Sequence, residues 1–320
     1  MIDISIIIVS WNAKDYLDNC ICSIMEETSK QKVEIIVVDN ASSDGSPDMV
    51  QKKYPNVILI SNEANLGFAK ANNVGIKQSK GKYIFFINSD VTLINGCINE
   101  MVVYMEQHTG IGILGPKILD KDGKPQRSCM EYPSLWNMFC RTFALDVCFP
   151  NSRIFSGLLM NYWSHNNMRC VDTLNGCFWM VRHDALNQVG LLDERFFIYG
   201  EDIDWCKRFR DAGWDVVFFP GAEAVHYGGA SSANAPVRFY VEMQCANLQL
   251  WKKHHNRLMY IGFLLLVWVH QILRLLGQSI IYAAKPRERT MSQFKINRSI
   301  ACIRWLMNSS KNVEQIAQKK

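Results

Sequence analysis

Residues 33–45 read VEIIVVDNASSDG, an apolar run that ends at Asp39 and is followed at once by a polar, turn-forming run. A short, continuous apolar run between turn residues is typical of a strand that is buried on both faces of a sheet. Serine, aspartate and glycine after such a strand turn the chain and cap a helix. We therefore predict a strand over residues 33–39, a turn, and a helix over residues 47–54.

The same alternation of strand and helix extends over residues 4–115. The further predicted strands cover residues 4–10, 57–61, 83–88 and 111–115, and the further predicted helices cover residues 16–27, 68–79 and 98–107. Continuous apolar strands separated by helices indicate a Rossmann-like α/β fold, with a mostly parallel central sheet and helices on both faces.

Three of the predicted strands end in polar clusters. These clusters are Ser10-Trp11-Asn12, Asp39-Asn40 and Asn88-Ser89-Asp90. Ligands of open parallel sheets bind beyond the carboxyl ends of the strands, so we expect the three clusters to line one rim of a binding site.

The alternation of strand and helix patterns stops over residues 117–170, which are rich in aromatic residues and show no regular periodicity. Lys121-Asp122-Gly123-Lys124 predicts a hairpin turn, and we expect the rest of the segment to be an insertion that faces a substrate. Regularity then returns. The predicted elements are a strand over 172–181, a helix over 183–189, an acidic helix after Gly200 and a strand over 216–220.

Composition narrows the class of protein. Hydrophobic residues make up 48% and charged residues 20%, which is typical of a folded chain and excludes a disordered one. The net charge of +5 is too small and too scattered to imply nucleic-acid binding. The 11 cysteines include no C-x-x-C pair, which indicates reduced thiols rather than a zinc site or a disulfide framework. Residues 1–9 do not resemble a signal peptide, so we expect the catalytic part in the cytosol.

The last third of the chain has another character. Residues 258–269 are an unbroken uncharged, mainly apolar run, and a second such run covers residues 275–284. A spanning helix needs about 20 predominantly apolar residues. Arg274 would lie inside such a span at a cost of about 2.5–3.5 kcal/mol.

Basic residues flank this region on both sides, which removes the charge asymmetry expected of a span. They are Lys252, Lys253 and Arg257 before it, and Lys285, Arg287 and Arg289 after it. A helix lying in the bilayer interface fits best, with a true span and a buried core or oligomer helix as the alternatives. We predict a catalytic domain over residues 1–235 and a helical, membrane-associating region over residues 236–320.

Two of the polar segments suit a nucleotide. Asp39 can accept hydrogen bonds from a uracil or thymine ring N–H or from a ribose, or it can serve only to order its loop. Asn65-Leu66-Gly67 follows a strand and begins a helix, where Gly67 would let the backbone approach a ligand closely.

Asn88-Ser89-Asp90 resembles a metal-binding D-x-D in which Asn replaces the first acid. One carboxylate with diphosphate oxygens is an ordinary shell for Mg²⁺ or Mn²⁺. His226, which we expect just after the last strand, would add a nitrogen ligand better suited to Mn²⁺ than to Mg²⁺, or would be structural.

The segment GEDIDWCKR at residues 200–208 places three carboxylates at the start of a helix. Helical spacing puts Asp204 beside Arg208 in a surface pair, and puts Asp202 on the apolar side with Cys206. Asp202 is therefore our first candidate for a general base and Glu201 the second, whereas simple helix N-terminal charges are the alternative. Neighbouring charge and burial would raise the pKa of Asp202, and the helix N-terminus would oppose that rise.

Taken together, these segments resemble a GT-A-fold glycosyltransferase of family 2, in its bacterial rhamnosyltransferase-like branch. The resemblance covers roughly residues 3–232. It depends on IIVSWN at 7–12, VVDNASSDG at 37–45, NLGFA at 65–69, NSD at 88–90, LLDERFFIYGEDIDWC at 191–206, and His226.

The resemblance implies an inverting, single-displacement transfer of one sugar, such as rhamnose, from a dTDP- or UDP-sugar with Mg²⁺ or Mn²⁺. It implies that Asp39 binds the base, that Asp90 and His226 bind the metal, and that Asp202 deprotonates the acceptor hydroxyl. The remaining expected donor-site residues are Ser10, Asn12, Asn65, Gly67, Asn88 and Ser89. We expect a lipid-linked or cell-surface polysaccharide acceptor and a peripheral or monotopic location on the cytoplasmic face of the inner membrane. A nucleotidyltransferase and a catalytically silent nucleotide-sugar-binding scaffold are the alternatives.

Overall fold

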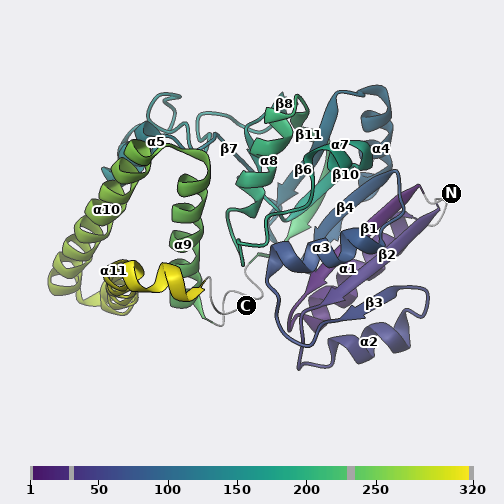
Figure 1. Ribbon diagram of the computed structural model, residues 1–320, viewed down its shortest axis with the longest axis horizontal. Helices are drawn as coiled ribbons and strands as arrows, with labels where there is room; N and C mark the ends of the chain where they lie inside the picture. The colour runs from purple at the N-terminus through teal and green to yellow at the C-terminus, as the bar shows by residue number, and fades with distance from the viewer. Residues whose placement is uncertain (1–2, 29–31, 229–234, 317–320) are drawn as a thin grey trace.

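The computed structural model describes residues 3–28, 32–228 and 235–316. Within these residues nine strands form one sheet in the order β3-β2-β1-β4-β10-β6-β11-β5, with β8 paired to β11 (Figure 1). The strands are β1 (Ile4–Ser10), β2 (Val33–Asp39), β3 (Ile58–Ser61), β4 (Tyr83–Asn88), β5 (Val91–Leu93), β6 (Ile111–Leu119), β8 (Arg169–Cys170), β10 (Phe178–Arg182) and β11 (Asp215–His226). A small second sheet joins β7 (Cys129–Met130) to β9 (Thr173–Leu174).

The sheet is mostly parallel, as predicted. Strands β3, β2, β1 and β4 are parallel neighbours, and so are β6 and β11. Strand β10 runs antiparallel to both β4 and β6, between the two parallel groups.

Helices cover both faces because the strand side chains alternate between two cores. Along β1, Ile6 and Ile8 pack into one core and Ile7 into the other. The first core is closed by α1 (Lys14–Glu27), α2 (Ser46–Lys53) and α4 (Cys97–Gln107). The second is closed by α3 (Phe68–Gln78), α7 (His183–Val189) and α8 (Glu201–Asp211).

Two strands run longer than predicted and one is divided. Strand β6 continues to Leu119 beside β11, which continues to His226, past Pro220. A register shift between Phe219 and Glu223 accommodates the proline, which cannot donate to a ladder. The strand predicted over residues 172–181 is instead β9 and β10, separated by the 175–177 turn.

The 117–170 segment contains the predicted hairpin turn. The Asp120 carboxylate accepts the backbone N–H groups of Asp122 and Lys124, each at 2.9 Å, and Gly123 takes φ +76°. The segment then forms α5 (Leu135–Thr142) and α6 (Leu145–Cys148).

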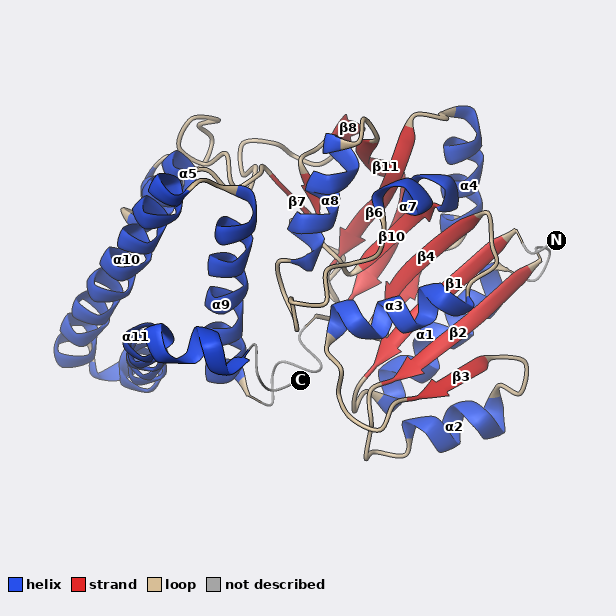
Figure 2. Cartoon of the chain, viewed as in Figure 1, coloured by secondary structure: helices blue, strands red, loops and turns tan. Residues whose placement is uncertain are grey.

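From residue 236 the described chain is helical (Figure 2). Helices α9 (Pro236–His254), α10 (Arg257–Ala284) and α11 (Arg289–Ile316) share a separate apolar core. Helix α9 lies beside α8, and α10 lies at the outer edge of the molecule, away from the sheet (Figure 1). Helix α10 continues unbroken past Arg274, joining the two apolar runs. Among the described residues it alone is long and apolar enough to cross a membrane, and only 17% of its most apolar window is buried.

Candidate active site

The three polar clusters lie along one rim of the sheet, as predicted. In the parallel ladders Ser10 pairs with Asp39, and Val9 pairs with Asn88. Strands β2, β1 and β4 therefore end side by side and present their polar ends together.

Asp39 and Ser10 present unsatisfied oxygens at this rim. Asp39 is 2% exposed, and its Oδ2 accepts the backbone N–H of Ser42 at 2.9 Å. Within the described residues, Asp39 Oδ1 and Ser10 Oγ are buried without a hydrogen-bond partner. A buried acceptor without a hydrogen bond costs about 1–3 kcal/mol, and a hydrogen-bond donor on a ligand would offset this cost.

The two asparagines of the predicted donor site shape its loops. Asn12 Oδ1 accepts the backbone N–H of Ser43 at 2.7 Å, and Asn12 takes φ +50°. Asn65 Oδ1 accepts the backbone N–H of Gly67 at 2.9 Å. Both side-chain oxygens are thus used to order the loops that surround the strand ends.

Gly67 allows a close approach to the protein itself. It takes φ +79°, and a Cβ at this position would collide with the carbonyl oxygen of Phe197. That carbonyl accepts the backbone N–H of Phe68 at 2.7 Å. The loop before α3 is therefore held against the loop that leads into α8.

Asp90 and His226 lie together, and the register of the sheet explains why. His226 is the last residue of β11 and pairs with Val91 of β5, so the prediction that it follows the strand is wrong. Its Nε2 lies 3.3 Å from Asp90 Oδ1. Asp90 itself is 7% exposed.

Gln126, which the sequence did not reveal, fixes the imidazole of His226. Its Nε2 donates to the His226 carbonyl at 2.5 Å, and its Oε1 lies 3.2 Å from His226 Nδ1. An imidazole that donates from Nδ1 keeps a lone pair on Nε2, the atom facing Asp90, and such a partner orients a metal ligand.

This pair fits a divalent cation that takes most of its ligands from substrate. No group of three His, Cys, Asp or Glu side chains in the described part of the chain could hold a metal. Two ligand atoms about 2.1 Å from one ion, at right angles, are roughly 3 Å apart, close to the separation of Asp90 Oδ1 and His226 Nε2. A carboxylate, an imidazole and phosphate oxygens together suit Mn²⁺, and oxygen ligands suit Mg²⁺.

Asp202 faces a cavity. Gly200, with φ +82°, begins α8, and Asp202 then lines a cavity of about 450 Å³ together with Asn175, Tyr199 and Ile203. Its Oδ1 accepts the backbone N–H of Ile203 at 2.8 Å. Burial raises the pKa of Asp202, and nearby backbone N–H groups oppose that rise. On the apolar side of α8, where helical spacing predicted it, the side chain lines this cavity.

Glu201 lies apart from this cavity. It is 5% exposed, and its Oε2 has no hydrogen-bond partner within the described chain. Burial, followed by the charge of Asp202, raises its pKa well above the ordinary value. Of the two candidate bases, only Asp202 lines the cavity.

Cys177 lies between the strand ends that carry Asp90 and the cavity that Asp202 lines. Burial raises the pKa of its thiol to about 12, and the next largest causes include the charges of Asp90 and Asp202. The Cys177 carbonyl accepts the backbone N–H of Asn88 at 2.9 Å. Asp90 at the strand ends and Asp202 at the cavity therefore lie close to the same short turn, with Ser89 buried between Asn88 and Asp90.

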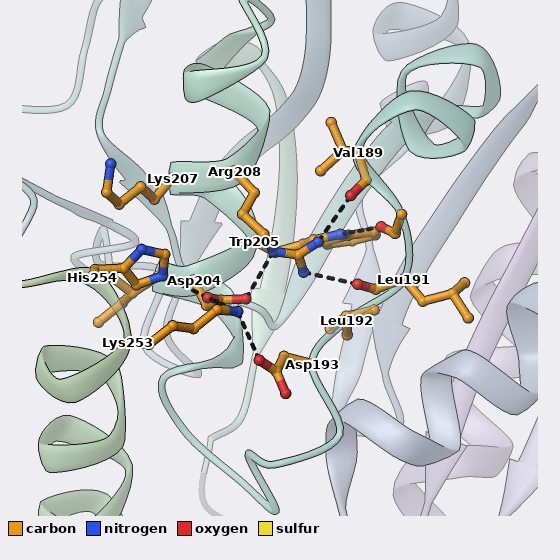
Figure 3. Close-up of polar contacts among 12 residues, drawn as sticks. Val189, Leu191, Leu192, Asp193, Asp204, Trp205, Lys207, Arg208, Lys253 and His254 are labelled. Atoms are coloured by element: carbon orange, nitrogen blue, oxygen red, sulfur yellow. Dashed lines mark hydrogen bonds and ion pairs between the residues drawn. The ribbon is translucent and has the colours of Figure 1, made fainter.

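Asp204 is not in a surface pair, which corrects the sequence prediction. Its carboxylate does bond Arg208 Nε at 2.9 Å (Figure 3). The Asp204 side chain is nevertheless fully buried. Lys253 Nζ at 2.5 Å and His254 Nε2 at 2.7 Å, both from α9, also reach it. Burial alone would raise its pKa, but these partners outweigh burial and lower it. The reason is tertiary, because α9 packs over the helix face that spacing had assigned to solvent.

The same network extends into the loop between α7 and α8. Lys253 also bonds Asp193 Oδ2 at 2.7 Å, and Arg208 donates to the carbonyls of Val189 and Leu191 (Figure 3). The clamp formed by Asp193, Asp204, Arg208, Lys253 and His254 thus ties the helix that carries Asp202 to the C-terminal helices. Lys253 is accordingly not free to act as one of the basic flanking residues.

Comparison with known proteins identifies the class. Residues 5–190 match the family Glycosyl transferase family 2. The N-acetylglucosaminyl-diphospho-decaprenol L-rhamnosyltransferase of Mycobacterium tuberculosis is 30% identical over 242 residues, which cover 72% of this chain and 78% of that protein. The low-salt glycan biosynthesis hexosyltransferase Agl10 of Haloferax volcanii is 24% identical over 89% of this chain and 88% of its own.

Solved structures confirm the fold. The mannosyltransferase PcManGT from Pyrobaculum calidifontis, solved with GDP-Man and Mn²⁺, has a TM-score of 0.57 at 15% identity, covering 95% of this chain and 86% of that one. Residues 1–349 of S. aureus TarS give a TM-score of 0.51 at 15% identity, with coverages of 97% and 92%. The chain belongs to glycosyl transferase family 2 and has the GT-A fold, as predicted, and the nucleotidyltransferase alternative is set aside.

Proposed function

We propose that this glycosyltransferase moves one sugar from a dTDP- or UDP-sugar to a hydroxyl of a lipid-linked or cell-surface polysaccharide acceptor, with inversion. The observation that carries the proposal is the convergence of Asp90 and Asp202 on Cys177, with Asp202 open to a cavity. The names of the rhamnosyltransferase and hexosyltransferase relatives support the acceptor class, and the first of them supports rhamnose as the sugar.

The strand ends bind the nucleotide in this proposal. Asp39 Oδ1 and Ser10 Oγ, both buried and unsatisfied in the described protein, accept hydrogen bonds from the base or ribose. Asn12, Asn65 and Gly67 hold the loops in place around them. Asn88 and Ser89 lie beside the diphosphate.

Asp90 and His226 hold Mg²⁺ or Mn²⁺, and Gln126 keeps His226 Nε2 turned toward the site. When bound, the cation neutralises charge on the leaving diphosphate.

Asp202 is the general base. Burial raises the pKa of Asp202, which makes it a better proton acceptor than an ordinary aspartate, and nearby backbone N–H groups oppose that rise. As it takes the proton of the acceptor hydroxyl, that oxygen forms a bond to the anomeric carbon on the face opposite the diphosphate. The anomeric carbon–oxygen bond breaks, and its electron pair leaves with the nucleoside diphosphate. Attack from the opposite face inverts the anomeric centre.

The exposed apolar side chains of helix α10 support a location at a membrane surface. Leu258, Leu265, Leu276 and Ile280 are 57–80% exposed. At 3.6 residues per turn these four side chains share one face of the helix. Arg274 lies on the opposite face, so an interfacial helix does not bury its charge in lipid. We propose that residues 1–235 are the catalytic domain and residues 236–320 bind the cytoplasmic face of the inner membrane peripherally or monotopically.

The test is isothermal titration of the purified chain with dTDP-, UDP- and GDP-sugars in Mn²⁺, Mg²⁺ or EDTA. We expect one dTDP- or UDP-sugar to bind, and to bind more tightly with the metal. Asp90→Asn, which keeps the shape of the side chain and removes its charge, should abolish the metal dependence. Failure of every nucleotide sugar to bind would refute the donor site. If the protein binds a nucleotide sugar but hydrolyses it no faster than the uncatalysed background, the catalytically silent scaffold would be favoured.

A further inference from the structure

The cavity that Asp202 lines extends away from the sheet and into the C-terminal helices. Its walls come from the 130–159 segment and from α5, α8, α9, α10 and α11. Most of the lining is apolar, including Met138, Leu158, Met243 and Leu266. Three arginines from three different helices join this lining: Arg141 of α5, Arg274 of α10 and Arg298 of α11.

These arginines gather around one histidine. Burial, and then the positive charges of Arg274, Arg141 and Arg298, lower the pKa of His270 to about 4. Burial also lowers the pKa of the Arg298 guanidinium, and Arg274 adds to this effect. Arg141 and Arg298 are half-buried, whereas Arg274 is exposed at the edge of the cavity. Like charges that lie close together repel one another, and an anion among them would remove that repulsion.

Among the described residues, no carboxylate pairs with this arginine cluster. In the described part of the chain none of Arg141, Arg274 and Arg298 has a carboxylate oxygen within 4.0 Å. Arg298 stacks on the ring of Tyr240 at 4.1 Å, and its Nε has no hydrogen-bond partner there. Gln271, which is fully buried, donates to Tyr240 Oη at 2.8 Å and also keeps a free Oε1.

The spacing between the cluster and Asp202 suits a sugar phosphate. Ala246 of α9 packs beside Gly200, two residues before Asp202, and Tyr240 lies six residues earlier on α9 beneath Arg298. Six residues of α-helix span about 9 Å. This rise along α9 is comparable with the length of one sugar ring and the phosphate attached to it.

We propose that this cavity binds a lipid-linked phosphate or diphosphate acceptor, with its anionic group on Arg141, Arg274 and Arg298 and its terminal sugar hydroxyl at Asp202. The inference deepens the proposed function and rests on it. Guanidinium groups match phosphate oxygens in a bidentate fork, which would account for three arginines that line a mostly apolar cavity without a carboxylate partner. The lipid chain follows the apolar lining toward α10, whose opposite face carries the exposed leucines.

Binding of farnesyl diphosphate to the full chain tests this site. Farnesol, which has only the apolar chain, and inorganic pyrophosphate, which has only the anion, are the two partial probes. We expect farnesyl diphosphate to bind at least about tenfold more tightly than farnesol or pyrophosphate, because only it has both the anion and the chain. Arg274→Gln and Arg298→Gln should each weaken it about tenfold or more. Arg304→Gln, an exposed arginine on the same helix as Arg298, is the matched control and should change nothing.

Binding of the nucleotide sugar, measured on the same samples, separates this inference from the proposed function and also reports folding. If farnesyl diphosphate binds no better than farnesol while the donor still binds, the acceptor site is wrong and the transferase proposal stands. Phosphatidylglycerol vesicles, with phosphatidylcholine as the control, provide the other arm. If they compete with farnesyl diphosphate through Arg274 and Arg298, the cavity holds a membrane phospholipid and the acceptor assignment is overturned.

Discussion

Replacing Asp204 with asparagine removes the negative charge that Arg208, Lys253 and His254 share. The side chain is fully buried, and its oxygens lie 2.5–2.9 Å from these three partners. Removing one partner of a buried ion pair typically costs about 3–5 kcal/mol, because the remaining charges are left uncompensated. At about 2–4 °C per kcal/mol for a large domain, we expect Asp204→Asn to lower the melting temperature by roughly 6–20 °C.

The same helix provides a matched control. Lys207 and Asp211 form another i,i+4 ion pair on α8 at 2.8 Å, but the Asp211 side chain is 58% exposed. An exposed pair contributes about 0–1 kcal/mol, so Asp211→Asn should lower the melting temperature by no more than about 4 °C. Thermal unfolding of both variants, followed by circular dichroism at pH 7.5, compares a buried with an exposed pair in one helix.

The pH dependence gives a second readout of the same clamp. Because folding lowers the pKa of Asp204 below its ordinary 3.8, the carboxylate stabilises the folded protein above that pH. The stabilisation is lost as the pH falls below about 3.8 toward the folded pKa, so wild type and Asp204→Asn should converge in stability there. Equal melting temperatures for Asp204→Asn and Asp211→Asn at pH 7.5 would refute the clamp.

Three further substitutions test separate parts of the site. Asp39→Asn should weaken nucleotide binding about 10–100-fold in titration calorimetry without changing the fold, because it removes a charged acceptor; unchanged affinity would exclude Asp39 from the donor site. Gly67→Ala should destabilise the protein by at least about 2 kcal/mol in urea unfolding, whereas Gly123→Ala, at a similar φ with open space around it, should cost about 1 kcal/mol; equal costs would contradict the close contact with Phe197. Glu201→Gln should gain thermal stability over wild type as the pH rises from 5 to 8, because a raised folded pKa makes ionisation above 4.5 unfavourable; a constant difference would contradict the burial of a carboxyl with one unsatisfied oxygen.

The parallel sheet, and the grouping of polar residues where its strands end, could be predicted from the local sequence pattern. Residues 4–10, 33–39 and 83–88 are apolar runs closed by polar residues, and parallel neighbours end at the same edge, so their grouping needed no tertiary information. The pairing of Asp90 with His226 was expected from resemblance. The physical cause is the register of β11 against β5, which depends on a strand longer than its sequence pattern suggested.

The misjudged residues all depend on contacts distant in sequence. Asp204 looked exposed because helical spacing reports only one helix, while Lys253 approaches it from α9. Gln126 lies in the irregular segment, where no periodicity marks a residue that orients a histidine. Arg274 looked like a defect in an apolar helix because the cavity it lines is assembled from several separate segments.

The most direct test of the central claim measures two properties of Asp202→Asn: its turnover and its affinity for the donor. Both use the nucleotide sugar that wild type binds, and turnover is followed with water or the acceptor as the nucleophile. If Asp202 removes the proton, turnover should fall about 10²–10⁴-fold, while the donor dissociation constant stays within about threefold of wild type. Turnover that survives the substitution would contradict Asp202 as the base. Donor affinity that is lost together with turnover would assign the side chain to binding rather than to proton transfer.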